Sequence, residues 1–307
     1  MQFHSELIQI GQVQIRYYGI IIVFAMLIGS WVAARIAKRE GLDPDHIWGA
    51  LTWAIIPGIV LARLWFVLFP PISAVADGRD TAWYFAHFFD LQNGAIAIWS
   101  GGLNIFGAVI GGSLGALIYL RRNKLPLGPW LDIAAVGLPL GQAIGRWANF
   151  VNQELYGIPT NLPWGITIDS AHRVDPYKSL VDFPVTQGFH PLFLYESLWS
   201  LLFFIVLLNI YTRYRRRWNL RPGDVFLIYA MQYAVIRFLL EAIRVEVTMI
   251  AGVNLWQLIS AIIFVLALAF LIYRHRPGAA AMPTEEPPKP REPVAEAVEQ
   301  QPASDES

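Results

Sequence analysis

Seven stretches of about 20 mostly apolar residues dominate this sequence, and an α-helix needs a stretch of that length to cross a lipid bilayer. Apolar residues make up 55% of the 307-residue chain and charged residues only 15%, whereas soluble domains contain about 25% charged residues. We therefore predict an all-α integral membrane protein with about seven transmembrane helices. The predicted spans are residues 16–36, 47–69, 95–120, 130–150, 191–211, 224–243 and 254–274.

The distribution of Lys and Arg predicts the orientation of these spans, because short cytoplasmic loops are enriched in both residues. The segments that follow the first, third, fifth and seventh spans contain 13 Lys and Arg residues, and the segments on the opposite face contain four. The N-terminus is therefore expected outside and the C-terminus in the cytoplasm.

Composition also divides the chain into two parts. Residues 1–276 are the predicted transmembrane catalytic domain, with a small external cap at about 151–190 that is rich in Pro, Asn, Asp and aromatic residues. Residues 277–307 hold seven of the 20 prolines and seven of the 23 acidic residues. Such a segment buries too little apolar area to fold, so we predict a disordered cytoplasmic tail. The chain has no cysteine, which excludes disulfides, a thiolate nucleophile and cysteine-ligated metals.

Three arginines lie inside or at the edges of predicted spans, namely Arg63, Arg146 and Arg237. A charged side chain at the centre of a membrane helix costs about 2.5–3.5 kcal/mol on insertion scales, so such residues usually face a polar cavity and mark a functional site. The structural alternative is that each arginine caps a neighbouring helix or pairs with an acidic residue.

A polar stripe runs along the predicted span 224–243. Tyr233, Arg237 and Glu241 recur every fourth residue, and Arg244 follows. Residues four apart lie on nearly one face of a helix, so this stripe must face protein or water. Glu241 either simply neutralises Arg237 or orients its guanidinium group toward an anion.

The segment GRWANFVNQELYG, residues 145–157, ends the fourth predicted span. It places hydrogen-bond donors and an acid close together, with glycines at both ends that permit close backbone approach. Those residues are Arg146, Asn149, Asn152, Glu154 and Gly157. In the structural alternative, the asparagines cap a helix end and Arg146 extends toward the membrane surface.

Two further segments contain distinctive residues that structural roles can explain. The segment GGLNIFGAVIGGSLG, residues 101–115, has glycines at spacings typical of tight packing between membrane helices. The segment HPLFLYE, residues 190–196, begins the fifth span with His190. A histidine at a membrane interface more often anchors a helix than acts as a catalyst.

Six segments, taken in order, resemble the bacterial prolipoprotein diacylglyceryl transferases. The resemblance extends over nearly all of residues 10–275, and the 145–157 segment is its most specific part. The segments are RYYG (16–19), AR (62–63), WSGGLNIFGAVIGG (99–112), GRWANFVNQELYG (145–157), HPLFLYE (190–196) and YAVIRFLLEAIR (233–244).

The resemblance implies a multi-pass enzyme of the bacterial inner membrane. Such an enzyme transfers the diacylglyceryl group of phosphatidylglycerol to the lipobox cysteine thiol in a prolipoprotein signal peptide, forming a thioether and releasing glycerol phosphate. The implied partners are phosphatidylglycerol, the prolipoprotein and membrane lipids, with no nucleic acid, cofactor or metal. The thiol belongs to the substrate, so an enzyme without cysteine is consistent with this reaction.

Residue by residue, the family's headgroup-binding arginines fall on Arg146 and Arg237, and its tyrosine before glycine falls on Tyr18. The resemblance and the polar stripe together give an expected catalytic set and an expected phosphatidylglycerol-binding set. The catalytic set is Arg146, Arg237, Glu154, Glu241, Tyr18 and Tyr233; the binding set is Arg146, Asn149, Asn152, Gly157, Arg237, Arg63, Arg244 and His190.

The chain departs from the family pattern at one position. Many members have a histidine in the motif GG-x-x-x-HGG, where this chain has Phe106, and Ala108 replaces the last glycine. We expect the arginine cluster to serve without an imidazole, with Glu154, Glu241 or a tyrosine relaying the proton and His190 as the fallback base.

Two other functions remain open at the level of sequence. One is a membrane protein that binds or transports phospholipid without catalysing a reaction. The other is a secondary transporter, which also places charges in the membrane, although the absence of internal repeats counts against it.

Overall fold

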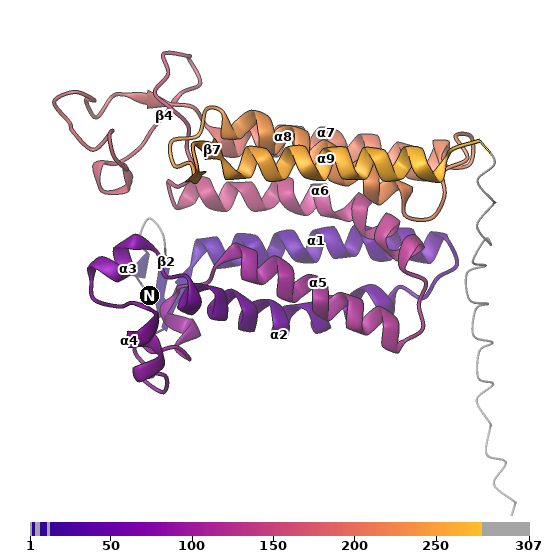
Figure 1. The fold of residues 1–307 in the computed structure, drawn as a ribbon, viewed down its shortest axis with the longest axis horizontal. Coiled ribbons are helices and arrows are strands. Elements are labelled where there is room, and N and C mark those ends of the chain that lie inside the picture. The colour runs from indigo at the N-terminus through magenta and orange to yellow at the C-terminus, as the bar shows by residue number, and fades with distance from the viewer. Residues whose placement is uncertain (1, 4–6, 11–12, 278–307) are drawn as a thin grey trace, which may run out of the picture.

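The computed structural model describes residues 2–3, 7–10 and 13–277. Long helices run side by side through this part of the chain and form an elongated bundle (Figure 1). In chain order they are α1 (Tyr17–Arg39), α2 (Asp45–Leu68), α5 (Ile105–Arg122), α6 (Leu127–Val151), α7 (Leu192–Asn209), α8 (Asp224–Glu241) and α9 (Leu255–Arg274). The expected tail, 277–307, falls outside the described residues from position 278 onward.

Within the described residues, five segments are long and apolar enough to cross a membrane. They are α1, α2, α5, α9 and the stretch Leu192–Tyr214, which joins α7 to a π-helical turn, η3 (Ile210–Tyr214). Large apolar side chains cover the outer surface, among them Ile56, Leu266 and Ile272, each more than 60% exposed. A helical chain with such a surface is a multi-pass membrane protein, because only lipid accommodates so much exposed apolar area.

The helices α6 and α8 are not among those five segments. They lie in the bundle beside the others (Figure 1), but they carry more polar residues. Asp132 and Arg146 belong to α6, and Gln232, Arg237 and Glu241 belong to α8. The same polar residues that reduce the hydropathy of these two helices build the site described below.

The prediction for the third span was wrong over residues 95–104. Helix α5 begins only at Ile105, and the preceding residues form a 3₁₀ turn, η1 (Ile98–Ser100), followed by Gly101 and Gly102 with φ of 94° and 64°. These left-handed conformations interrupt a helix. The Asn104 side chain then caps α5 by accepting a hydrogen bond from the backbone N–H of Phe106 at 2.9 Å.

Glycines bring two pairs of helices into close contact. In α5, Gly107, Gly111 and Gly115 lie against the backbone carbonyls of α2, so closely that an added Cβ would overlap them. In α6, Gly137 lies against the carbonyl of Gly29 in α1 in the same way. This confirms tight helix packing for three of the six glycines of the 101–115 segment, namely Gly107, Gly111 and Gly115, as in other membrane helix pairs.

The largest apolar core lies where α1, α6, α7, η3 and α8 meet. Ile133, Val136, Leu207 and Val225 are fully buried there. This core fixes α6, α7 and α8 relative to one another, and these three helices position the candidate site.

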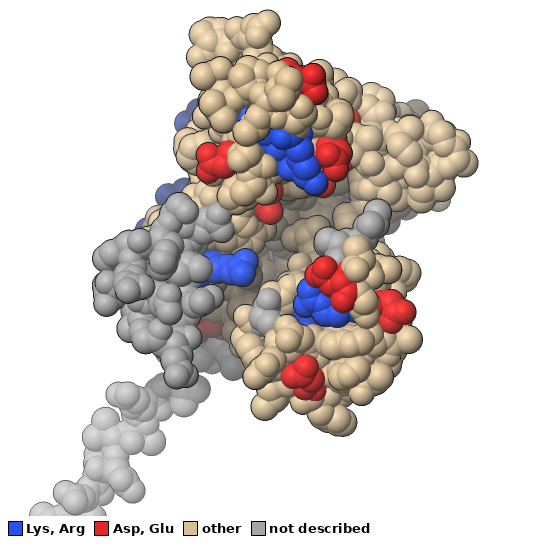
Figure 2. Space-filling view, turned by 90° about the vertical axis from the view of Figure 1, so that its left-hand side faces the viewer, with Lys and Arg blue, Asp and Glu red and all other residues tan. Residues whose placement is uncertain are grey.

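Short elements occupy the loops at one end of the bundle. Two short helices, α3 (Ile72–Ala76) and α4 (Thr81–Ala86), follow α2. Among the described residues, three small antiparallel sheets join β1 (Gln2–Phe3), β2 (Leu7–Ile10) and β3 (Val13–Arg16); β4 (Ile166–Thr167) and β5 (Gly188–Phe189); and β6 (Met249–Ile250) and β7 (Val253–Asn254). Viewed from this end, the molecule shows two lobes with a hollow between them (Figure 2).

Residues 151–190 form an ordered region around a small core of Tyr156, Ile168 and Phe189. Arg173 is 1% exposed and donates hydrogen bonds to the backbone carbonyls of Ile168 at 2.8 Å and Phe183 at 2.6 Å. One buried guanidinium group therefore holds together several turns of this loop region.

Candidate functional site

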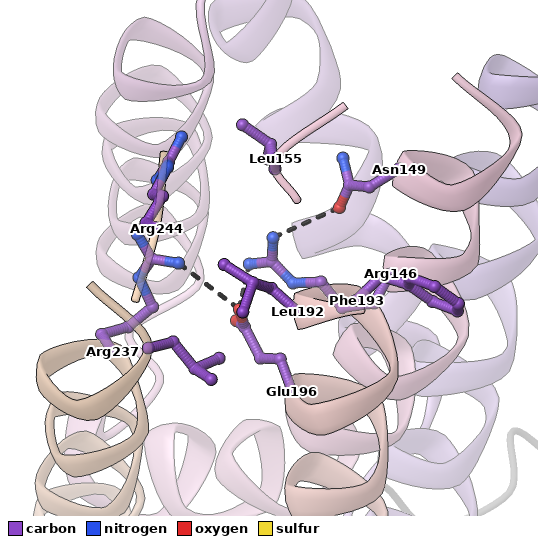
Figure 3. A pocket seen from close by; sticks show the side chains of 9 residues that line it. Arg146, Asn149, Leu155, Leu192, Phe193, Glu196, Arg237 and Arg244 are labelled. Carbon is purple, nitrogen blue, oxygen red and sulfur yellow. Dashed lines mark hydrogen bonds and ion pairs between the residues drawn. The ribbon is translucent and has the colours of Figure 1, made fainter. Parts of the chain in front are cut away.

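Two arginines from different helices converge on one carboxylate. Arg146 is in the last turns of α6, Arg237 is in α8, and Glu196 is near the start of α7 between them (Figure 3). Arg146 Nη2 lies 2.6 Å from Glu196 Oε1, and Arg237 Nη1 lies 3.4 Å from Glu196 Oε2. Each carboxylate oxygen thus faces one guanidinium group.

The charges continue in alternation along the end of α8 and the turn that follows it. Arg237 Nη2 lies 3.1 Å from Glu241 Oε2, and Arg244 Nη1 lies 3.5 Å from the same oxygen. The two acidic side chains are nearly inaccessible, whereas the arginine side chains are 17–21% exposed. The guanidinium groups are therefore the most exposed part of this network.

On the other side, Arg146 is connected to the loop after α6. Its Nη1 donates to Asn149 Oδ1 at 3.3 Å, and Asn149 Nδ2 donates to Glu154 Oε1 at 2.8 Å. Gln153 and Leu155 have positive φ values of 50° and 56°. This sharp, strained turn brings Glu154 back toward Asn149, and strain of this kind is concentrated at functional sites.

A small pocket lies at the centre of this network (Figure 3). Its walls combine guanidinium, carboxylate and amide groups with apolar side chains. The lining residues are Arg146, Asn149, Leu155, Leu192, Phe193, Glu196, Arg237, Leu240 and Arg244. Charge-assisted hydrogen bonds are strong in such an apolar setting, and arginine binds phosphate oxygens with a planar pair of donors. The pocket therefore suits an anionic group attached to an apolar molecule.

The two tyrosines of the expected catalytic set lie next to the arginines. Tyr18, at the start of α1, lies within electrostatic range of both Arg146 and Glu154. Tyr233 is one turn before Arg237 in α8 and lies within range of Arg146. Their phenol groups therefore border the arginine cluster, although neither is part of the pocket wall.

Other predicted residues support the loop around the pocket. Asn152 is the C-cap residue of α6. Gly157 donates its N–H to the carbonyl of His190 at 2.9 Å, and a Cβ at Gly157 would lie only 2.8 Å from the carbonyl oxygen of Ile243. His190 Nδ1 lies 3.0 Å from the Tyr195 hydroxyl, and that hydroxyl also accepts a hydrogen bond from Trp164 Nε1 at 2.9 Å. His190 therefore anchors the loop through its contact with Tyr195.

Arg63 is not part of the pocket lining. It is 6% exposed and donates hydrogen bonds to the backbone carbonyls of Gly94, Ala95, Gly101 and Gly102 at 2.6–3.2 Å. Its charge thus stabilises the loop before α5.

Glu196 lines the pocket but is absent from the catalytic and binding sets that we expected from the sequence. It lies in an apolar run, LFLYESLWSLLFFIVLLN, and an acidic residue in such a run needs a cationic partner. That signal was available in the sequence, but the partners are 41 and 50 positions away and only the fold identifies them.

Comparisons with known proteins agree with this picture. A family model described as "Prolipoprotein diacylglyceryl transferase" matches residues 5–273. Similar proteins, each named "Phosphatidylglycerol--prolipoprotein diacylglyceryl transferase", occur in several bacteria. The protein of Chloroflexus aggregans is 36% identical over 92% of both chains, and that of Nostoc sp. is 36% identical over 91% of this chain and 93% of its own. The protein of Thermotoga maritima is 39% identical over 87% of this chain and 83% of its own.

Proposed function

The chain belongs to the prolipoprotein diacylglyceryl transferase family, and from this premise we propose that it transfers the diacylglyceryl group of phosphatidylglycerol to the lipobox cysteine of prolipoproteins. The products are a thioether-linked lipid and glycerol phosphate. Family membership supports this enzymatic function and gives no support to phospholipid binding without chemistry.

The reaction is a displacement at a saturated carbon. The sulfur of the substrate cysteine attacks the glycerol carbon that carries the phosphodiester, and the bond between that carbon and the phosphate oxygen breaks. Negative charge then increases on the departing phosphate. A catalyst must stabilise that charge more strongly in the transition state than in the bound lipid.

The observation that carries the proposal is the convergence of Arg146 and Arg237 on one pocket with apolar walls. Guanidinium groups remain protonated, and a pair of them from two helices binds several oxygens of one phosphate. Arg244 adds a third positive charge to the same wall. We assign Arg146 and Arg237 to the phosphate, with Asn149 and Arg244 beside it, and Tyr18, Tyr233, Glu154 and Glu241 to the orientation of these groups.

We further propose that α6 and α8 also span the membrane, giving seven transmembrane helices with the N-terminus outside and the C-terminus in the cytoplasm. The basic residues at one end of the bundle support this orientation. Arg35, Arg122, Arg215 and Arg276 lie against aromatic rings there, with guanidinium carbons 4.0–5.3 Å from the ring centroids. The pocket then lies near the external face, where both secreted precursors and phospholipid headgroups are accessible.

A transfer assay tests this function. Purified protein is incubated with phosphatidylglycerol and a lipobox peptide, and mass spectrometry detects the added diacylglyceryl group on the peptide cysteine. We expect transfer by the natural protein and its loss in Arg146→Ala and Arg237→Ala, with both variants still inserted in membranes. Full activity of Arg237→Ala would show that the ion pairs are purely structural.

A further inference from the structure

The proposed reaction requires the substrate thiol to lose its proton inside the pocket, so a proton acceptor must be found there. A free cysteine has a pKa of about 8.5 and is mostly protonated near neutrality. Among the described residues that line the pocket, one is a carboxylate, Glu196, and none is a histidine. The pocket itself thus offers a single anionic acceptor.

The other acidic side chains of the network are less well placed. Glu241 is not part of the pocket wall, and its Oε2 lies 3.1 Å from Arg237 and 3.5 Å from Arg244. Glu154 accepts a hydrogen bond from Asn149 and is not part of the pocket wall. Neither presents an oxygen to a ligand in the pocket.

Histidine does not provide the acceptor either. The imidazole of His190 is hydrogen-bonded to Tyr195 and is not part of the lining. Phe106 occupies the position in the glycine-rich segment where the family resemblance implies a histidine, and its ring is stacked on Trp256.

We propose that Glu196 is the general base of this enzyme, an inference that rests on the proposed function. Its two oxygens occupy the space between the guanidinium groups that the lipid phosphate would bind. The 2.6 Å contact with Arg146 is an ion pair without the alignment of a hydrogen bond, and the contact with Arg237 is longer, at 3.4 Å. Phosphate oxygens can therefore replace the carboxylate at both arginines.

Lipid binding then activates the base. In the resting state both carboxylate oxygens of Glu196 face guanidinium groups. Once phosphate oxygens have replaced the carboxylate at the two arginines, an oxygen of Glu196 is free to accept the thiol proton. The thiolate therefore forms only when phosphatidylglycerol is already bound, which protects the precursor thiol from deprotonation in an empty site.

The thiol proton moves to an oxygen of Glu196, and the sulfur forms a bond to the glycerol carbon. The carbon–oxygen bond breaks, and its electron pair leaves with the phosphate oxygen, which produces glycerol phosphate. Glu196 then releases its proton to the departing phosphate or to water and returns to the two arginines.

A comparison of two nucleophiles tests the role of Glu196. One lipobox peptide contains the natural cysteine, and the other contains selenocysteine, whose selenol is already ionised at neutral pH and needs no base. We expect Glu196→Gln to lower the rate with the cysteine peptide by about 100-fold or more, the usual contribution of a general base. The rate with the selenocysteine peptide should fall far less, so the ratio of the two rates rises by a similar factor relative to the natural protein.

Glu241→Gln is the matched control, because it removes the other buried acid paired with Arg237. It should lower both rates together and leave their ratio unchanged. Glu196→Asp should restore part of the cysteine rate, since a carboxylate remains. An unchanged ratio in Glu196→Gln would overturn the proposal and make Glu196 a structural partner of the arginines. Failure of the natural protein to modify the cysteine peptide would instead refute the proposed function.

Discussion

The ring of Phe106 is stacked on the ring of Trp256, with centroids 4.3 Å apart and planes 5° from parallel. The stack joins the first turn of α5 to the first turn of α9, two helices far apart in sequence. Trp65 of α2 packs beside Phe106, with ring centroids 6.0 Å apart. Phe106 thus has a packing role at the position where the family resemblance led us to expect a histidine.

We expect Phe106→His to give no gain in transfer rate. The substitution also removes an apolar stack, and aromatic pairs of this kind contribute about 0.5–1.5 kcal/mol, so the free energy of unfolding should decrease by a similar amount. The transfer assay and thermal unfolding in detergent measure the two effects. An inactive natural protein that becomes active as Phe106→His would show that the imidazole is indispensable.

Lysine at either key arginine should support only part of the activity. Arg146 uses Nη1 for Asn149 and Nη2 for Glu196, and a single ammonium group cannot reproduce this planar fork. Loss of one charged hydrogen bond costs about 1.5–3 kcal/mol, so Arg146→Lys and Arg237→Lys should lower kcat/KM by about tenfold to hundredfold. Arg276→Lys, at an exposed position away from the pocket, is the control and should retain full activity.

Arg63→Ala should lower the stability of the protein. The substitution removes the charged donor to four backbone carbonyls, so we expect the free energy of unfolding to decrease by at least about 3 kcal/mol. Arg79→Ala, which breaks an exposed ion pair with Asp77, should cost less than about 1 kcal/mol. Thermal unfolding and KM for phosphatidylglycerol distinguish the roles: a stable Arg63→Ala protein with a raised KM would make Arg63 a binding residue.

Alanine substitutions at two adjacent glycines in α5 should have different effects on stability. A Cβ at Gly111 would overlap the carbonyl of Pro57 in α2, whereas a Cβ at Gly112 would meet its nearest atom at 3.7 Å. We expect Gly111→Ala to destabilise the protein by about 1–3 kcal/mol, the usual cost of overpacking, and Gly112→Ala to be tolerated. Equal unfolding temperatures for the two variants would contradict the close packing of α5 on α2.

The sequence predicted most helices because apolar length and glycine or polar flanks are local signals. The predicted span 224–243 corresponds to α8 (Asp224–Glu241), and 130–150 corresponds to α6 (Leu127–Val151). The error at residues 95–104 has a local cause as well. Those residues are apolar enough to extend a span, but Gly101 and Gly102 adopt left-handed conformations that hydropathy does not register.

The site was harder to predict because its contacts join distant parts of the chain. The stripe of Arg237 and Glu241 follows from helical spacing, and the structure confirms their contact at 3.1 Å. Glu196 and Arg63 each required knowledge of a partner outside their own helix. For Glu196 that partner is a pair of guanidinium groups, and for Arg63 it is a set of carbonyls that no side-chain pattern reveals.

The glycine contacts between α2 and α5 have a mechanical consequence. These two helices are locked together along their length, while α2 makes few contacts with α1. All the charged residues of the pocket belong to α6, α7, α8 or the turn after α8, which are in the other block, comprising α1 and α6–α9. An enzyme that admits a two-chain lipid and a membrane-anchored peptide can widen along the boundary between the blocks without breaking an ion pair in the pocket. The Phe106–Trp256 stack crosses that boundary at the first turns of α5 and α9.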